Sequence, residues 1–147
     1  MYNYNFGSLF KNSVKKYNRK IALIDVEGKK FSYDYLDKKS DQFASILKKQ
    51  KNIYVVAIDS VKNVNTIIAF LSSLKAGLPY FFLDLNLPKN RIKKIFKKTN
   101  CKLLISNKKK IKLNINIISI QKKYKKNFLK NNFEKVNPDD PAYIMFT

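Results

Sequence analysis

The stretch Ile-Tyr-Val-Val-Ala-Ile at residues 53–58 most constrains the fold, because it is apolar at both alternating sets of positions. A strand with one solvated face alternates apolar and polar residues, whereas a strand inside a parallel sheet is apolar throughout because helices cover both faces. Parallel neighbours also need a crossover connection, usually a helix. The stretch therefore predicts a buried strand of an α/β sheet with helices on both sides.

The residues around this strand alternate short apolar runs with patterns of helical period. Further strands are expected at 80–84, 102–106, 115–119 and 142–146, and a short strand pair at 21–25 and 29–32. Four helices are predicted from apolar positions three and four residues apart. Their expected inner faces are Phe6, Leu9, Phe10 and Val14; Leu36, Phe43, Ala44 and Leu47; Val64, Ile67, Ile68, Leu71 and Leu74; and Ile92, Ile95 and Phe96. The predicted class is α/β, with right-handed βαβ units around a mostly parallel sheet.

Residues that begin or end helices support this division of the chain. Ser32 and Ser60 are expected to open the second and third helices, and Pro88 suits the first turn of the fourth. Gly77 and Asn100 are expected to end the third and fourth helices. Gly77 stands at the position after a helix where the backbone commonly adopts the left-handed conformation.

The residue inventory excludes several kinds of catalytic site. The chain has no histidine and one cysteine, which excludes zinc sites and Ser-His or Cys-His catalysis within it. Cys101 is expected to be a small core residue, and its isolation favours a reducing cytoplasm. No stretch approaches the roughly 20 apolar residues of a membrane-spanning helix, and the N-terminus lacks the order of a secretory signal.

A net charge of +21 raises the alternative of a stand-alone basic module that binds nucleic acid or an anionic surface. Nearly all the basic residues are lysines, however, and Arg19 and Arg91 are the two arginines. Proteins that read bases or grip phosphates favour the planar fork of arginine. The lysines are spread along the chain among asparagines and isoleucines, and the dense patches at 107–112 and 121–126 are interpreted as solvated surface. Nucleic acid is therefore not the expected partner.

Ligands of parallel sheets usually bind beyond the carboxyl ends of the strands. The candidate binding loops are therefore those after Ile58, Leu83, Ser106 and Phe146. None of them contains a glycine-rich phosphate motif, and the chain has three glycines in all. The chain on its own is thus not expected to hold a phosphate.

Two segments resemble the first two core motifs of adenylation domains, which are adenylate-forming enzymes that activate carboxylic acids with ATP. Ser32, Tyr33 and Leu36 match the first motif. The second motif is matched by Leu74, Lys75, Ala76, Gly77, Tyr80, Leu83, Asp84, Pro88 and Arg91. Phe82 departs from it, since the family usually has proline there. These residues are interpreted as structural: Asp84 is expected to fix the turn after its strand, and Lys75 to interact favourably with a helix dipole.

The final residues, Asp139 to Thr147, resemble the strand that leads into the third family motif, the phosphate-binding loop. Thr147 would align with the first residue of that loop. The resemblance covers about residues 6–147 and implies the N-terminal portion of an adenylation domain. Its pattern is closest to enzymes that load amino acids onto a carrier protein, as in nonribosomal peptide synthetases and D-alanyl carrier-protein ligases.

In the complete family enzyme, the resemblance places the phosphate loop, the substrate pocket and a C-terminal lobe later in the chain, together with ATP and Mg²⁺. No residue of 1–147 is assigned a catalytic or metal-binding role, and the chain alone is expected to hold no cofactor and to be inactive. A truncated or frameshifted reading frame, the end of a contig, and one half of a split enzyme completed by a second chain all remain open. The identity of the activated acid also remains open.

Overall fold

A computed structural model describes residues 5–108, 114–120 and 136–146 of the chain. Thr147 and most of the lysine-rich stretches 107–112 and 121–126 lie outside these residues. The helices are α1 (Phe6–Tyr17), α2 (Tyr33–Lys48), α3 (Val64–Lys75) and α4 (Lys89–Thr99). The strands are β1 (Ile21–Ile24), β2 (Lys30–Ser32), β3 (Val56–Asp59), β4 (Tyr80–Leu83), β5 (Leu103–Ile105) and β6 (Asn116–Ile118). No helix in the described part of the chain is long and apolar enough to cross a bilayer.

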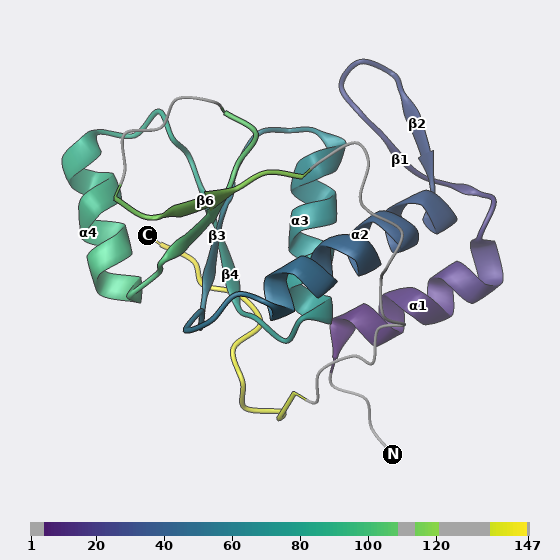
Figure 1. Ribbon diagram of the computed structural model, residues 1–147. Coiled ribbons are helices and arrows are strands. Elements are labelled where there is room, and N and C mark those ends of the chain that lie inside the picture. The colour runs from purple at the N-terminus through teal and green to yellow at the C-terminus, as the bar shows by residue number, and fades with distance from the viewer. Residues whose placement is uncertain (1–4, 109–113, 121–135, 147) are drawn as a thin grey trace.

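The central sheet has four strands in the order β4-β3-β5-β6, and every pairing in it is parallel. All four residues of β3 are buried, which confirms the prediction for this part of residues 53–58. β1 and β2 form a separate antiparallel pair, as expected. Figure 1 shows this pair standing apart from the central sheet, beyond the end of α2.

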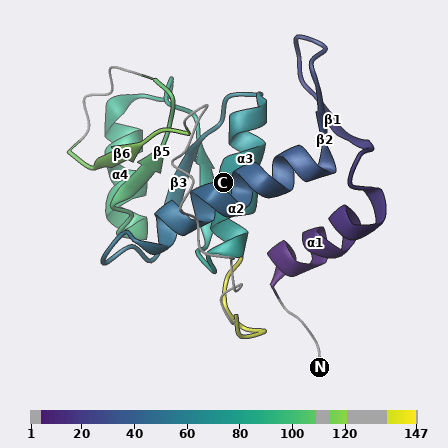
Figure 2. The same ribbon diagram turned by 45° about the vertical axis from the view of Figure 1, so that its right-hand side comes forward.

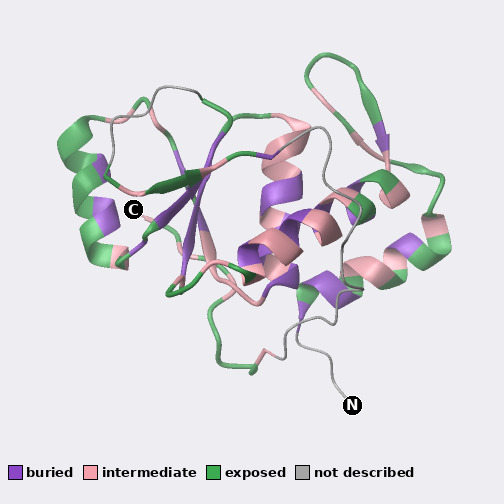
Figure 3. Cartoon of the chain, viewed as in Figure 1, coloured by how far each residue is buried: buried purple, intermediate pink, exposed green. Residues whose placement is uncertain are grey.

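Helices cover both faces of the central sheet (Figures 1 and 2). On one face, Val56 and Ile58 of β3 pack with the buried side chains of α2 and α3. On the other face, Val55 and Ala57 pack with α4. The right-handed crossovers from β3 to β4 and from β4 to β5 run in opposite directions along the sheet, so their helices fall on opposite faces. Figure 3 shows the buried residues concentrated in the strands and on the helix sides that face them.

Three of the predicted helix boundaries are confirmed. The Ser32 side chain accepts a hydrogen bond from the amide of Tyr35 at 3.2 Å and so caps α2. Gly77 follows α3 with a φ of +68°, and its amide donates to the carbonyl of Leu74. Asn100 ends α4 with a φ of +51°. Pro88 precedes α4 as its N-cap residue, one position before the predicted first turn.

The predicted start of α3 is wrong. The helix begins at Val64, and its cap is Asn63, whose side chain accepts a hydrogen bond from the amide of Thr66 at 3.1 Å. Ser60 is held at the end of the sheet instead, because its amide donates to the carbonyl of Leu83 at 3.0 Å. Ser60 therefore extends the pairing between β3 and β4 and does not cap the helix.

Two expected apolar faces are only partly buried. In α1, Val14 is buried, but Phe6 and Leu9 are 57% and 49% exposed. The helix buries Gly7 and Ser8 instead, with Gly7 against Lys75 of α3. The terminal stretch 142–146 forms one parallel bridge between Tyr143 and Tyr80 and not a full buried strand. This stretch lies at the sheet edge, so its alternate residues face solvent.

The start of α3 gives a first test. Replacing Asn63 with Ala removes a capping acceptor, and we expect a loss of about 1 kcal/mol in the free energy of unfolding. The matched variant Ser60→Ala, at the cap position favoured by sequence alone, should change this free energy by less than about 0.5 kcal/mol. Urea unfolding followed by circular dichroism measures both, and a larger loss for Ser60→Ala would contradict the assignment.

Candidate functional site

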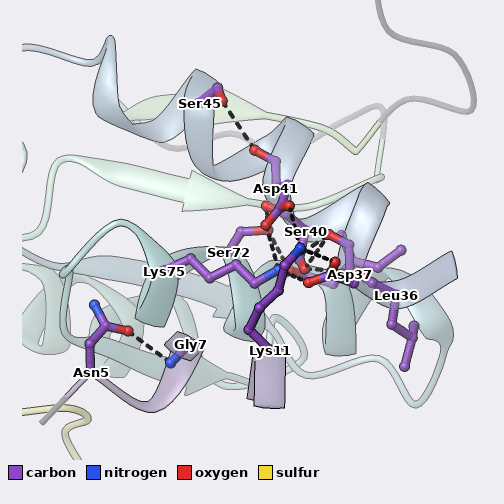
Figure 4. A network of polar contacts seen from close by, with 11 residues as sticks. Asn5, Gly7, Lys11, Leu36, Asp37, Ser40, Asp41, Ser45, Ser72 and Lys75 are labelled. Carbon is purple, nitrogen blue, oxygen red and sulfur yellow. Dashed lines mark hydrogen bonds and ion pairs between the residues drawn. The ribbon is translucent and has the colours of Figure 1, made fainter. Parts of the chain in front are cut away.

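Lys75, from the second family motif, is the most deeply buried charged residue in the described part of the chain. Its side chain has no exposed surface, although it is the last residue of α3. Its ammonium lies 2.8 Å from a carboxylate oxygen of Asp37, 2.6 Å from one of Asp41 and 3.2 Å from the Asp37 carbonyl (Figure 4). An ammonium group has three hydrogens to donate, so each of them has an acceptor.

Lys11 of α1 completes this cluster. Its ammonium donates to the second carboxylate oxygen of Asp37 and lies 3.4 Å from the second oxygen of Asp41. We call Lys11, Asp37, Asp41 and Lys75 the ion-pair tetrad. Its two ammonium groups balance its two carboxylates. The tetrad joins α1, α2 and α3. A helix-dipole interaction was expected for Lys75 from the sequence, whereas the two ion pairs of its ammonium were not predicted.

The tetrad also shifts the pKa of Lys11. Partial burial lowers this pKa, but the hydrogen bond to Asp37 and the attraction of Asp41 outweigh burial, so the pKa is raised above its usual value of 10.5. A raised pKa in the folded state means that the contribution of Lys11 to stability is complete below 10.5. This contribution is lost as the pH rises through the raised value.

Gly7 allows α1 to approach Lys75 closely. A Cβ atom at this position would lie 2.6 Å from Cγ of Lys75 and 2.9 Å from the side-chain oxygen of Asn5. That oxygen accepts a hydrogen bond from the Gly7 amide and caps α1 (Figure 4). The ring of Phe10 lies 5.6 Å from the Lys75 ammonium, close enough for a cation–π interaction.

The other residues of the second motif hold turns and strand edges. The Asp84 carboxylate accepts a hydrogen bond from the amide of Asn86 at 2.8 Å, which confirms that it fixes the turn after β4. Leu83 is buried under α4, and Arg91 is exposed on that helix. Phe82, at the position where the family has proline, is 48% exposed.

Tyr80 attaches the final described residues to the sheet. Its amide donates to the carbonyl of Ala142 at 3.3 Å, and its carbonyl accepts from the amide of Ile144 at 2.8 Å. The ring of Phe146 meets that of Phe81 edge to face, with centroids 5.4 Å apart. Residues 142–146 therefore run beside β4 in the same direction, toward the carboxyl edge of the sheet. Thr147, the predicted first residue of the phosphate loop, follows them outside the described residues.

Two hollows lie at the carboxyl edge of the sheet. The first, of about 290 Å³, is lined by Asp59 and by Ser106, whose hydroxyl donates to the Asp59 carboxylate at 2.8 Å. The second, of about 410 Å³, is an apolar groove between the β1–β2 pair, the loop before α3 and Phe82. The predicted loops after Ile58 and Ser106 thus meet at one cavity. Neither Asp59 nor Ser106 was a predicted site residue, although each is a polar residue at the carboxyl end of a predicted strand.

The described residues include no group of three or more His, Cys, Asp or Glu side chains able to hold a metal ion. Cys101 is buried, and burial raises the pKa of its thiol, which keeps the sulfur protonated near neutral pH. This agrees with its predicted role as a core residue. Within the described residues, the two motifs cap a helix, end another and fix the turn after β4.

The parallel sheet, the helices on both faces and the strand-end crevice define a doubly wound α/β domain. Residues 10–147 match the family described as AMP-binding enzyme. The chain belongs to the AMP-binding enzyme family.

The chain is also similar to individual known proteins and structures. The chain is 31% identical over 149 aligned residues to gramicidin S synthase 2 of Brevibacillus brevis, an alignment that covers 97% of the chain and 3% of that protein. Its fold is similar to the N-terminal subdomain of NpsA from Klebsiella oxytoca, with a TM-score of 0.80, 22% identity, and coverage of 96% of the chain and 38% of that structure. An artificially fused adenylation–PCP di-domain of the same organism, NpsA-ThdA, gives a TM-score of 0.82 at 22% identity, covering 96% and 28%. The chain thus spans a small part of the relatives it matches.

The close approach at Gly7 gives a second test. Replacing an exposed glycine inside a helix with Ala normally raises the free energy of unfolding by about 1 kcal/mol. For Gly7→Ala we expect the free energy of unfolding to fall by about 1–3 kcal/mol, because the added methyl group overpacks against the buried stem of Lys75. Asn12→Ala, at an exposed position of the same helix, is the matched control and should be neutral or slightly stabilising. Thermal and urea unfolding measure both, and a more stable Gly7→Ala protein would contradict the packing described.

Proposed function

We propose that this chain forms the first part of the N-terminal lobe of an ATP-dependent, AMP-forming ligase that activates an amino acid and loads it onto a carrier protein. The observation that supports this most is the attachment of residues 142–146 beside β4. This attachment directs the chain toward the carboxyl edge of the sheet, with the second-motif residues Tyr80 and Asp84 at the two ends of β4. The similarity to gramicidin S synthase 2 supports the amino-acid class of the substrate.

In this proposal the described residues act as a support. The ion-pair tetrad fixes α1, α2 and α3 against one another. Helices α2 and α3 cover one face of the sheet, and the sheet edge then positions the phosphate loop that we propose begins at Thr147. The reactive groups would come from motifs that the resemblance places later in the complete enzyme.

The complete enzyme would need ATP, which supplies the adenylyl group, and Mg²⁺, which balances phosphate charge. The described residues do not fit either group. They contain no cluster of metal ligands and no glycine-rich loop with converging backbone amides. We therefore assign no step of the reaction to a residue of this part of the chain, and we expect the 147-residue chain by itself not to form an adenylate.

A carrier protein and the missing remainder of the enzyme are the proposed partners, and the cytoplasm is the proposed location. The artificial adenylation–PCP fusion NpsA-ThdA supports the first partner by analogy. A basic module for nucleic acid would instead require lysines gathered on one face. Helices α1 and α4 lie on opposite sides of the sheet (Figure 1). Both carry exposed lysines, Lys15 and Lys16 on α1 and Lys93 and Lys97 on α4. This spread favours solvated surfaces.

The test is amino-acid-dependent exchange of labelled pyrophosphate into ATP. We expect a protein that joins this chain to the later family motifs to catalyse exchange with one or a few amino acids. The matched comparison is the 147-residue chain alone, for which we expect no exchange and no change of melting temperature with ATP and Mg²⁺.

Exchange that depends on fatty or aromatic acids and on no amino acid would contradict the proposed substrate class. Binding of ATP by the 147-residue chain alone would contradict the assignment of this chain as a support.

A further inference from the structure

We propose that the cavity at the carboxyl ends of β3 and β5 binds a small ligand that carries a primary ammonium group on a short aliphatic body. The assignment of this site does not rest on the function proposed above. We refer to it as the Asp59 cavity, defined by Asp59, Asn63, Thr66, Ser106 and Lys108 at its polar part.

The topology of the sheet places a crevice at this position. The chain leaves β3 through α3 toward β4 on one side, and it returns through α4 to β5 on the other side of β3. The strand order therefore reverses between β3 and β5. In open α/β sheets, ligands bind outside the carboxyl ends of the strands at such a point. The Asp59 cavity, of about 290 Å³, lies there.

Asp59 gives the cavity its chemical preference. This residue is 7% exposed and lines the cavity. Within the described residues, its carboxylate accepts one hydrogen bond, from the Ser106 hydroxyl at 2.8 Å, and no Lys or Arg forms an ion pair with it. A carboxylate has about four lone-pair sites, and a buried charge without a partner is costly. The carboxylate is therefore able to accept further donors from a bound cation.

The remaining walls select among cations. Ile58, Ala69, Ile105 and Ile120 form an apolar part of the lining, which suits a hydrocarbon body. Asp59 is the one acidic residue among the described residues of the lining, so a divalent metal ion, which prefers several carboxylate or carbonyl oxygens, is poorly matched. An ammonium group donates three hydrogen bonds, and the amides and hydroxyls beside Asp59 offer further acceptors.

Two sources of this chemistry fit the cavity: a simple aliphatic amine and an α-amino acid. Lys108 lines the cavity as well, and Asn63, Asn65 and Thr66 bring the start of α3 to it. A carboxylate on the ligand would be favoured by both the lysine and the positive end of the helix dipole. The two sources share the ammonium contact with Asp59 and differ in this second contact.

The test is a calorimetric titration of the full chain with n-butylammonium near pH 7 at constant ionic strength. We expect saturable binding at one site. Asp59→Asn should weaken it by about tenfold or more, because the substitution removes a charge-assisted hydrogen bond but keeps the shape and an acceptor for Ser106. The matched control is Asp34→Asn, which removes a carboxylate from the exposed face of α2 and should leave binding unchanged. 1-Butanol, which has the same body without the charge, should bind at least about tenfold more weakly.

Norvaline separates the two sources, since it combines a similar aliphatic body with a carboxylate. Tighter binding of norvaline than of butylammonium assigns an amino acid to the cavity, and weaker binding assigns a simple amine. Circular dichroism verifies that each variant is folded. The proposal is overturned if neither compound binds the folded chain, if Asp59→Asn binds butylammonium as well as the parent, or if 1-butanol binds equally well.

Discussion

The ammonium of Lys75 is buried where three helices meet, and the arrangement of the domain depends on how its charge is balanced. Asp37 and Asp41 come from α2, one turn apart, and Lys11 reaches them from α1. Removing one member of a buried ion pair leaves an uncompensated charge, which is far more costly than the net contribution of an exposed pair. The tetrad therefore favours one relative placement of α1, α2 and α3 over slipped alternatives. Gly7 adds a steric condition, because α1 meets the stem of Lys75 without room for a Cβ atom.

This placement has consequences at the sheet. Helices α2 and α3 cover the face formed by Val56 and Ile58, while α4 covers the opposite face. The reversal of strand order at β3 then brings two kinds of surface to the carboxyl edge. One is the Asp59 cavity between β3 and β5, and the other is the end of residues 142–146 beside β4. The family membership gives the second surface its proposed role in adenylation, whereas the first is a feature of this chain's own side chains.

Sequence reasoning predicted the features that depend on local chemistry. The buried strand at β3, the Ser32 cap, the left-handed Gly77 and the turn at Asp84 each follow from neighbouring residues alone. Features that depend on contacts between distant residues were missed. A lysine near a helix end is normally solvated. Lys75 is buried because α3 packs on α2, which brings it to Asp37, 38 residues earlier in the chain. The Asp59–Ser106 contact joins residues 47 positions apart. The cap of α3 is Asn63 and not the predicted Ser60, because the Ser60 amide pairs with the sheet through the carbonyl of Leu83.

The claim that the tetrad organises the domain is tested most directly by a double-mutant cycle between Lys75 and Asp37, with Lys75→Met, Asp37→Leu and the double variant compared by urea unfolding. Each single substitution should cost about 3–5 kcal/mol, since it leaves part of a buried charge unbalanced. The double variant should be less destabilised than the sum of the two, with a coupling free energy of about 2 kcal/mol or more. Strictly additive losses, or single losses below about 1 kcal/mol as for an exposed pair, would contradict the account.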